Sequence, residues 1–362
     1  MIVPGSSTTN CTCVSSSLCL AEDIITDGSG HINLRGRYCS TSQVCCTHPQ
    51  SSTVTTPPTT TSSSSYTLTG CGVRDPNLVR FSPKITSSSS SSLTTFGEFP
   101  WMAAILDTAT EGFLCGGSLV GESVVLTAAH CVSGRSPSSI TVRLGEWDAS
   151  STTESIDSQD IVVDTVLIHP DYYAPGVFYD LALLGLKTAA DTSKASIGEV
   201  CLPSASSSTQ TYVLDQCQVA GWGKETFASV GISAVLKKIK VPLVSFLTCQ
   251  SQLQAARLGS RFRLHESFLC AGGKAGRDAC TGDGGGPLMC PLGSEPDRMV
   301  QVGVVSWGLE CGSNVPGVYA DLIRPEANNW VMDNVKNLQQ SRTSGLAVTL
   351  IKKKEVSAAA WG

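Results

Sequence analysis

The sequence predicts a mainly β protein, in which a barrel or sandwich domain ending in a helix follows a small disulfide-knotted domain. Short β-rich runs separated by turn residues fill the chain from Phe99 onward. A Ser/Thr/Pro-rich run separates the first six cysteines from the other ten. Sixteen dispersed cysteines favour a disulfide framework formed in an oxidising compartment, so we expect a secreted, extracellular protein.

Residues 11–46 hold the first six cysteines, which are Cys11, Cys13, Cys19, Cys39, Cys45 and Cys46. A segment this short cannot build a core without cross-links. Six cysteines allow fifteen pairings, and their spacing alone does not choose among them. Residues 47–70 have almost nothing to bury, and their composition predicts an extended linker.

Residues 71–338 carry the pattern of an all-β domain. The runs expected to form strands are Trp101–Leu106, Ser123–Leu126, Ile140–Leu144, Ile161–Ile168, Leu181–Leu186, Gln216–Val219, Val300–Val305 and Gly317–Tyr319. A helix is predicted over Pro325–Leu338, since Pro suits the first helical position and Trp330, Val331 and Val335 share one face. Residues 339–362 lose this periodicity and are expected to form a disordered tail.

The overall charge and hydropathy exclude two classes of partner. A net charge of −5 and an isoelectric point near 5.6 argue against binding to nucleic acid. The apolar stretches are all far shorter than the ~20 residues that cross a bilayer, so no membrane span is expected.

Three separated motifs carry residues that suit acyl-transfer chemistry. Residues 127–131 place His130 after a strand, and residues 179–184 place Asp180 directly before an apolar run. Residues 278–288 read DACTGDGGGPL. In this order the motifs resemble the His, Asp and Ser stations of the trypsin/chymotrypsin peptidases, the S1 family. Supporting motifs are Cys115-Gly116-Gly117-Ser118-Leu119, Gly221-Trp222-Gly223 and Ser306-Trp307-Gly308.

The resemblance covers residues 71–338 and implies a trypsin-like double six-stranded β-barrel with a cleft between the barrels. The disulfides it implies in this domain are Cys71–Cys201, Cys115–Cys131, Cys217–Cys290, Cys249–Cys270 and Cys280–Cys311. The first six cysteines resemble those of an arthropod clip domain, which implies Cys11–Cys45, Cys13–Cys39 and Cys19–Cys46. All sixteen cysteines are then paired.

Residues 71–76, 96–102 and 257–268 resemble a subfamily, the clip-domain serine protease homologues of insects. There GDSGGP has become GDGGxP, and here Gly284 stands in the serine's place. Glycine offers no nucleophilic oxygen, so the resemblance implies a protein that is not an enzyme. The activation site also reads Lys84-Ile85-Thr86-Ser87 in place of Ile-Val-Gly-Gly, a second argument against catalysis.

The remaining site residues are assigned by the same resemblance. His130 and Asp180 should form the remnant of the triad, either as a satisfied polar network or with residual chemistry. The backbone N–H groups of Gly282 and Gly284 correspond to an oxyanion hole. The former specificity pocket comprises Asp278, Ser306, Gly308 and Gly317. Its carboxylate would either bind a basic side chain or lie in a collapsed or wet pocket.

An acidic loop is the one candidate for a metal site. Glu146, Glu154 and Asp157 lie in a loop that binds calcium in some members of the family. Acidic surface loops are also often merely solvated, so the sequence leaves both readings open. No cofactor is expected to be required.

The function implied by the resemblance is that of an extracellular, haemolymph cofactor or adaptor in an innate-immune proteolytic cascade. Such a protein would act in prophenoloxidase activation and melanization. The implied partners are prophenoloxidase, the clip protease that activates it, and an upstream trypsin-like protease that processes this chain. The alternatives are a pattern-recognition or adhesion protein and a residual serine-type endopeptidase.

Overall fold

Two antiparallel sheets form the larger part of the molecule, and the first of them closes into a six-stranded barrel in the order β3-β4-β5-β8-β7-β6. The computed structural model describes residues 12–15, 43–46, 70–74, 78, 93–151, 154–204, 212–224, 231–273, 282–309 and 314–343. The barrel strands are β3 (Met102–Asp107), β4 (Phe113–Gly121), β5 (Val124–Thr127), β6 (Ile140–Leu144), β7 (Gln159–Ile168) and β8 (Ala182–Leu186).

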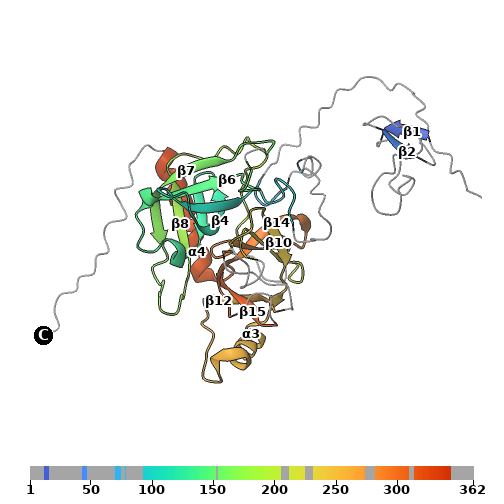
Figure 1. Ribbon diagram of the computed structural model, residues 1–362. Helices are drawn as coiled ribbons and strands as arrows, with labels where there is room; N and C mark the ends of the chain where they lie inside the picture. The colour runs from blue at the N-terminus through green and yellow to red at the C-terminus, as the bar shows by residue number, and fades with distance from the viewer. Residues whose placement is uncertain are drawn as a thin grey trace, which may run out of the picture. The chain divides into compact units, whose positions relative to one another are not determined.

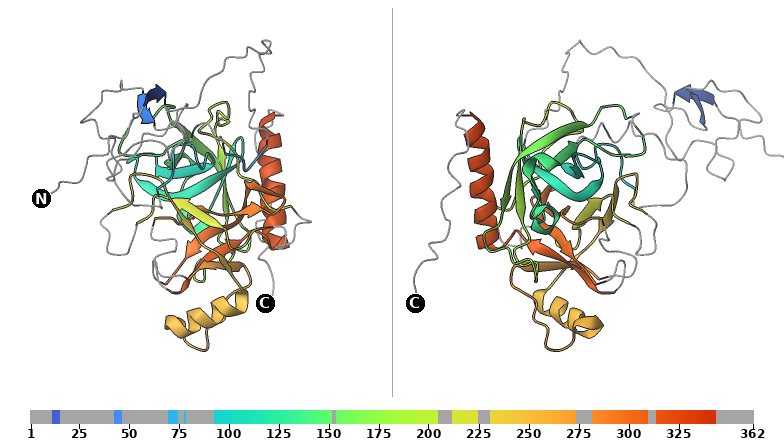
Figure 2. Two further views of the ribbon diagram at one scale, coloured as in Figure 1. Left: turned by 90° about the vertical axis from the view of Figure 1, so that its right-hand side faces the viewer. Right: turned by 60° about the vertical axis from the view of Figure 1, so that its left-hand side comes forward.

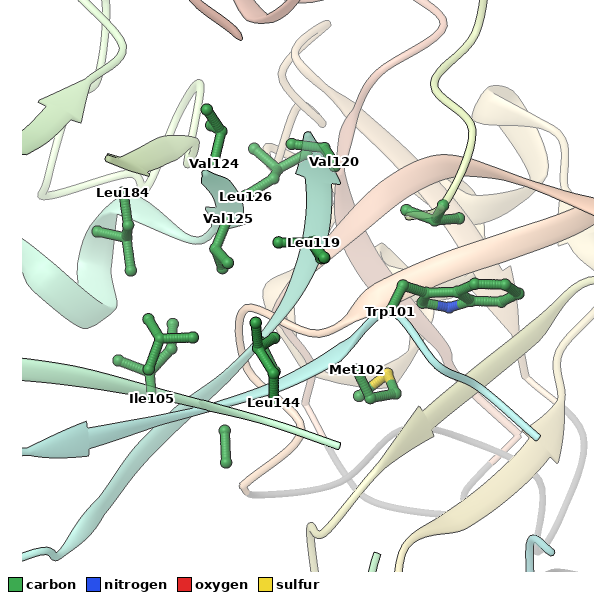
Figure 3. Packing of buried hydrophobic residues seen from close by; sticks show 14 of the residues in the cluster. Trp101, Met102, Ile105, Leu119, Val120, Val124, Val125, Leu126, Leu144 and Leu184 are labelled. Carbon is green, nitrogen blue, oxygen red and sulfur yellow. The ribbon is translucent and has the colours of Figure 1, made fainter. Parts of the chain in front are cut away.

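Alternating side chains fill this barrel. In β6, Ile140, Val142 and Leu144 are buried while the residues between them are partly exposed, which is the period of two expected of a strand. Figure 3 shows side chains from several strands, among them Ile105, Leu119, Val125 and Leu144, gathered in one cluster. The barrel therefore has a packed apolar core of its own.

The second sheet has seven strands in the order β10-β9-β13-β14-β15-β12-β11. Its strands are β9 (Gln218–Gly221), β10 (Lys237–Lys240), β11 (Leu243–Val244), β12 (Phe268–Gly272), β13 (Pro287–Leu292), β14 (Glu295–Trp307) and β15 (Pro316–Asp321). The two end strands, β10 and β11, are separated in the chain only by Val241 and Pro242. The continuous segment 237–244 thus provides both end strands of the sheet.

Pro242 explains why this run counts as two strands. Proline has no N–H to donate to a sheet ladder. On one side of it, Val241 N–H donates to Cys217 O at 2.9 Å, and on the other, Gly272 N–H donates to Pro242 O at 2.9 Å. The sheet therefore joins its ends through residues 237–244, and the six strands implied by the resemblance become seven.

Helices cover the ends and one side of the barrels. The short helical segments are α2 (Ala129–Val132), η3 (Pro137–Ser139), α3 (Phe246–Leu253) and the π-helical turn η5 (Gln254–Leu258), and α4 (Pro325–Thr343) is the C-terminal helix. Helix α4 packs on β4, β5 and β8 of the first barrel (Figure 1). In Figure 2, α3 projects from the end of the domain that carries β12 and β15.

The chain divides into two units, Met1–Tyr66 and Thr67–Gly362, and the division falls inside the predicted linker. In the first unit the structure describes an antiparallel pair, β1 (Thr12–Ser15) with β2 (Gln43–Cys46), in which Thr12 pairs with Cys46. Each of the three disulfides implied for residues 11–46 includes a cysteine outside the described residues.

The mainly β class and the C-terminal helix are confirmed. All eight predicted runs overlap strands, but seven further strands of the described residues, and helix α3, were not predicted. One boundary also differs. Helix α4 continues to Thr343, so the tail predicted from residue 339 begins inside the helix. The last buried apolar residue of α4 is Leu338, and a pattern based on burial ends there although the backbone stays helical.

Candidate functional site

His130 lies in the single turn of α2, which follows β5. The next residue, Cys131, is bonded to Cys115 of β4, and this disulfide fixes the turn to the barrel. The side chain of His130 is one-third exposed, at 33%. The strand and the disulfide therefore present one imidazole at the surface of the first barrel.

Asp180 lies two residues before the start of β8, and its side chain is fully buried. Three donors reach its carboxylate. His130 N–H donates to Oδ1 at 2.8 Å, the His130 ring pairs through Nδ1 with Oδ2 at 2.7 Å, and the Ser306 hydroxyl donates to Oδ2 at 2.6 Å. Because a carboxylate accepts, a neutral ring in this pair carries its proton on Nδ1 and its lone pair on Nε2.

Gly284 occupies the position next to that lone pair. A Cβ added to Gly284 would lie 3.3 Å from His130 Nε2 and 3.9 Å from Cys115 Sγ. The backbone is fixed here, since Gly116 N–H donates to Gly284 O at 2.8 Å and Gly285 N–H donates to Val305 O at 2.9 Å. The site thus has the base and its orienting carboxylate, and no side-chain atom where a nucleophile would stand.

The turn from Gly282 to Gly285 also holds the predicted oxyanion groups. Both of these glycines have a left-handed φ, 100° and 79°, which side chains adopt only with strain. Within the described part of the chain, no hydrogen bond is donated by the N–H of Gly282 or of Gly284. Among these residues neither donor is used, as an oxyanion hole requires.

The Gly-Trp-Gly motif at residues 221–223 has a local role that the sequence did not indicate. Gly223 N–H donates to Asp283 Oδ1 at 2.9 Å. A Cβ on Gly223 would come within 2.5 Å of the Asp283 carboxylate, and one on Gly221 would come closer still. The two glycines leave room for the carboxylate beside the former nucleophile position.

The predicted specificity pocket is described only in part. Ser306 supports Asp180, as above. A Cβ added at Gly308 would meet nothing within 4 Å, so the chain is open there. Gly317 lies in β15 and pairs with Ala271 of β12. Asp278 lies outside the described residues, as does the implied disulfide Cys280–Cys311.

The other disulfides implied for this domain are present in the structure. They are Cys71–Cys201, Cys115–Cys131, Cys217–Cys290 and Cys249–Cys270. Cys115, His130 and Cys131 also lie close enough together to suggest a metal site. Both sulfurs are bonded to one another, however, and a disulfide sulfur is not a thiolate ligand.

The acidic loop brings two of its three predicted residues together. Burial, the charge of Glu154 and a hydrogen bond to Glu154 raise the pKa of Glu146 to about 7. Arg143 lies 3.7 Å from Glu146 and forms a two-point pair with Asp160, at 2.7 and 2.8 Å. Asp157 is exposed, and no three acidic groups of the described residues converge here. Two converging carboxylates fit a hard cation, because it would relieve their repulsion.

A row of aromatic rings beside Asp180 was not found from the sequence. Phe178 stacks on His265 with centroids 3.9 Å apart, and Tyr179 N–H donates to Ser267 Oγ at 3.1 Å. Tyr179 has a left-handed φ of 49°. The loop before Asp180 is thereby fixed to the segment between α3 and β12, 85 or more residues later in the chain. No periodicity in the sequence signals this long-range stack.

The described residues include no helix that is long and apolar enough to cross a membrane.

Comparisons with known proteins match both units. The trypsin family model matches residues 90–331, and the model described as the serine protease clip domain PPAF-2 matches residues 3–47. Phenoloxidase-activating factor 2 of Galleria mellonella is 43% identical over 279 residues, which are 74% of this chain and 89% of that protein. The inactive CLIP domain-containing serine protease A3 of Aedes aegypti is 37% identical over 324 residues, covering 88% and 66%. The corresponding protease A28 of Anopheles gambiae, also named inactive, is 39% identical over 254 residues, covering 68% and 64%.

Proposed function

Because the chain belongs to the trypsin family and is a clip-domain serine protease homologue, we propose that it is a non-catalytic cofactor in an extracellular proteolytic cascade. The observation that carries the proposal is the site itself. His130 Nδ1 lies 2.7 Å from Asp180 Oδ2, the pairing that a catalytic triad needs. Gly284 leaves the position of the nucleophile without a side-chain atom.

Catalysis by the remaining groups would be too slow for a protease. Removing the nucleophile from a triad of this kind costs about 10⁶ in kcat and leaves only about 10³–10⁴ over the uncatalysed reaction. His130 can activate nothing but water. Relatives that cover most of this chain carry the word inactive in their names, which supports the proposal.

The proposed partners follow from the relatives' names. Two relatives are called phenoloxidase-activating factors 2 and 3. We propose that this chain binds prophenoloxidase or the clip protease that activates it, in the haemolymph, and that an upstream trypsin-like protease processes it. Calcium is proposed as a structural ligand of Glu146 and Glu154, with Asp157 close by in the chain, and no other cofactor is proposed.

The test is a reconstituted assay. Purified full-length protein, intact or cut by a trypsin-like protease, is added to prophenoloxidase and its activating protease, with and without Ca²⁺. We expect phenoloxidase output to rise several-fold. The variant His130→Ala is the matched control and should stimulate equally, since no catalysis is used. No rise under any of these conditions would remove the proposal.

A residual peptidase makes the opposite prediction. Cleavage of an arginine ester by the wild type that disappears in His130→Ala would show hydrolysis at this site. We expect no cleavage above the background of the ester alone.

A further inference from the structure

Helix α3 and the turn η5 form a projection that packs on β12 and β15. Ser245 caps α3, since its hydroxyl accepts a hydrogen bond from Thr248 N–H at 3.3 Å. Cys249 of α3 is bonded to Cys270 of β12. Figures 1 and 2 show the helix standing out from the end of the domain in each view. We refer to residues 245–266 as the α3 projection.

The projection is rigid, because its loop is bonded to its helix. Leu264 N–H donates to Gln250 Oε1 at 3.0 Å, and Gln254 Nε2 donates to Phe262 O at 2.8 Å. Cys249 and Leu253 are fully buried, in a small core with Leu264, Phe268 and Val318. The inward face of α3 is thus packed against the rest of the domain.

The outward face of α3 is unusual for a surface helix. Residues 245–256 contain no charged side chain. Leu247 is 74% exposed, the largest value among the exposed large hydrophobic residues of the described chain, and its neighbour Phe246 is 39% exposed. Phe246 and Leu247 therefore form an exposed apolar pair, flanked by the exposed polar residues Ser245, Thr248 and Ser251. An apolar pair with a polar surround is a candidate contact surface for another molecule.

Basic residues follow this exposed apolar pair in the chain. Arg257, Arg261 and Arg263 are exposed, and none of them takes part in an ion pair between described residues. The only acidic residue of the projection, Glu266, pairs with Arg324 at 3.3 Å. The projection is therefore basic in a chain whose net charge is −5.

We propose that the α3 projection is a docking element that inserts Leu247 and Phe246 into an apolar groove with an acidic rim on a partner protein of the cascade. This inference rests on the proposed function and assigns that function a surface. The apolar pair supplies the buried centre of the contact, and the three arginines supply the charge complementarity that directs association. A projection held by a disulfide loses little conformational freedom on binding.

The probe proteins are prophenoloxidase and its activating clip protease, the latter with its catalytic serine blocked, each immobilised separately. Binding of the full chain is measured by biolayer interferometry at two salt concentrations. Leu247→Asp should raise Kd at least tenfold for one of the two probes. Arg257→Glu with Arg261→Glu should weaken binding and flatten its salt dependence. Met332→Asp is the control, because Met332 is 44% exposed on α4, outside the projection, and it should bind as the wild type does.

Leu247→Ser provides a milder replacement if the aspartate variant does not fold, and it should also weaken binding. Unchanged Kd in both Leu247 variants overturns the inference, and so does wild-type protein that binds neither probe. Two further measurements test for other binding partners of this surface, and either result would also overturn the inference. The first is sedimentation velocity showing self-association of the wild type that Leu247→Asp abolishes. The second is binding of the wild type to vesicles of phosphatidylcholine with phosphatidylserine that Leu247→Asp abolishes.

The two proposals fail in different ways. Wild-type protein that binds a probe through Leu247 but does not raise phenoloxidase output contradicts the proposed function and leaves the docking surface in place. Wild-type protein that raises output equally with Leu247→Asp and Leu247→Ser contradicts only the docking surface.

Discussion

At the residue scale, the difference between this site and a peptidase lies in Gly284. The Cβ position of Gly284 lies 3.3 Å from His130 Nε2, so a side chain there would meet the base directly. Asp180 holds the imidazole through Nδ1 on the opposite side, and the Ser306 hydroxyl in turn donates to the Asp180 carboxylate. Within the described residues, the N–H groups of Gly282 and Gly284 donate no hydrogen bond.

The variant Gly284→Ser tests whether these groups are positioned for chemistry. We expect it to react with a fluorophosphonate probe, because the serine oxygen then forms a bond to phosphorus, fluoride leaves and His130 takes the proton. This phosphonylation needs the base and the oxyanion donors but no specificity pocket. The close contact at 3.3 Å requires a small shift of the imidazole, which its one-third exposure allows. Labelling is measured by mass spectrometry of the intact protein.

The wild type and the double variant Gly284→Ser with His130→Ala are the controls, and both should stay unlabelled. Absence of labelling in Gly284→Ser would show that the base or the N–H groups are not in reactive positions.

Glu146 predicts a pH-dependent affinity for calcium. Burial and Glu154 raise the pKa of Glu146 to about 7, and the carboxyl must lose its proton to bind a cation. We therefore expect calcium to bind about tenfold more tightly at pH 8 than at pH 6, as measured by calorimetry. Glu146→Gln should remove this dependence and most of the affinity. Asp164→Asn, an exposed change on β7, should alter neither. An affinity that does not change with pH would contradict this assignment.

At the scale of elements, the strands with regular alternation were predictable, and those with glycine, proline or lysine were not. Residues 140–144 alternate and form β6 as predicted. Strand β13 carries Pro287 and Pro291, and β10 reads KKIK, so neither resembles an isolated strand. These segments are strands because neighbouring strands supply their hydrogen bonds and burial. Helix α3 begins at a capping residue, Ser245, but Phe246 and Leu247 face the solvent, so its apolar residues do not mark its buried face.

His169 joins three elements and predicts a loss of stability in acid. It follows β7, is buried, and stacks on Tyr179 with centroids 4.8 Å apart while Trp330 of α4 lies 4.8 Å away. Asp171 N–H donates to its Nδ1 at 3.2 Å. Within the described residues its Nε2 has no partner. Burial lowers the pKa of His169, and the nearby charge of Asp171 only partly opposes this.

Below pH ~6.5 the unfolded chain therefore binds a proton at His169, whereas the folded protein binds it only at a lower pH. The stability contributed by neutral His169 is present above that pH and is lost as the pH falls toward the lowered value. His169→Phe keeps an aromatic ring and removes the titration. Below pH ~6.5, the wild type should lose up to about 1.4 kcal/mol of unfolding free energy per pH unit relative to this variant. Urea unfolding at pH 7.5, 6 and 5 measures it. A difference that is constant over this range would exclude His169 as the titrating group.

At the scale of the whole molecule, the site lies where the two sheets meet. The sequence resemblance predicted this meeting, because its motifs come from both halves of the chain. It could not predict the α3 projection or the stack of Phe178 on His265, since both depend on long-range packing specific to these side chains. Asp180 is the residue that joins the halves, through His130 beside β5 and Ser306 of β14.

This junction accounts for a carboxylate–imidazole pair in a protein without a nucleophile. Asp180 is fully buried and accepts three hydrogen bonds, so Asp180→Ala would leave Ser306 and the His130 backbone N–H without their acceptor. We expect Asp180→Ala to cost about 2–4 kcal/mol of unfolding free energy. His130→Ala should cost about 1 kcal/mol or less, because its ring is one-third exposed and Asp180 keeps its other two donors. Urea unfolding of both variants at pH 7.5 compares them directly. Equal losses of unfolding free energy in the two variants would contradict a role of this pair in stabilising the junction.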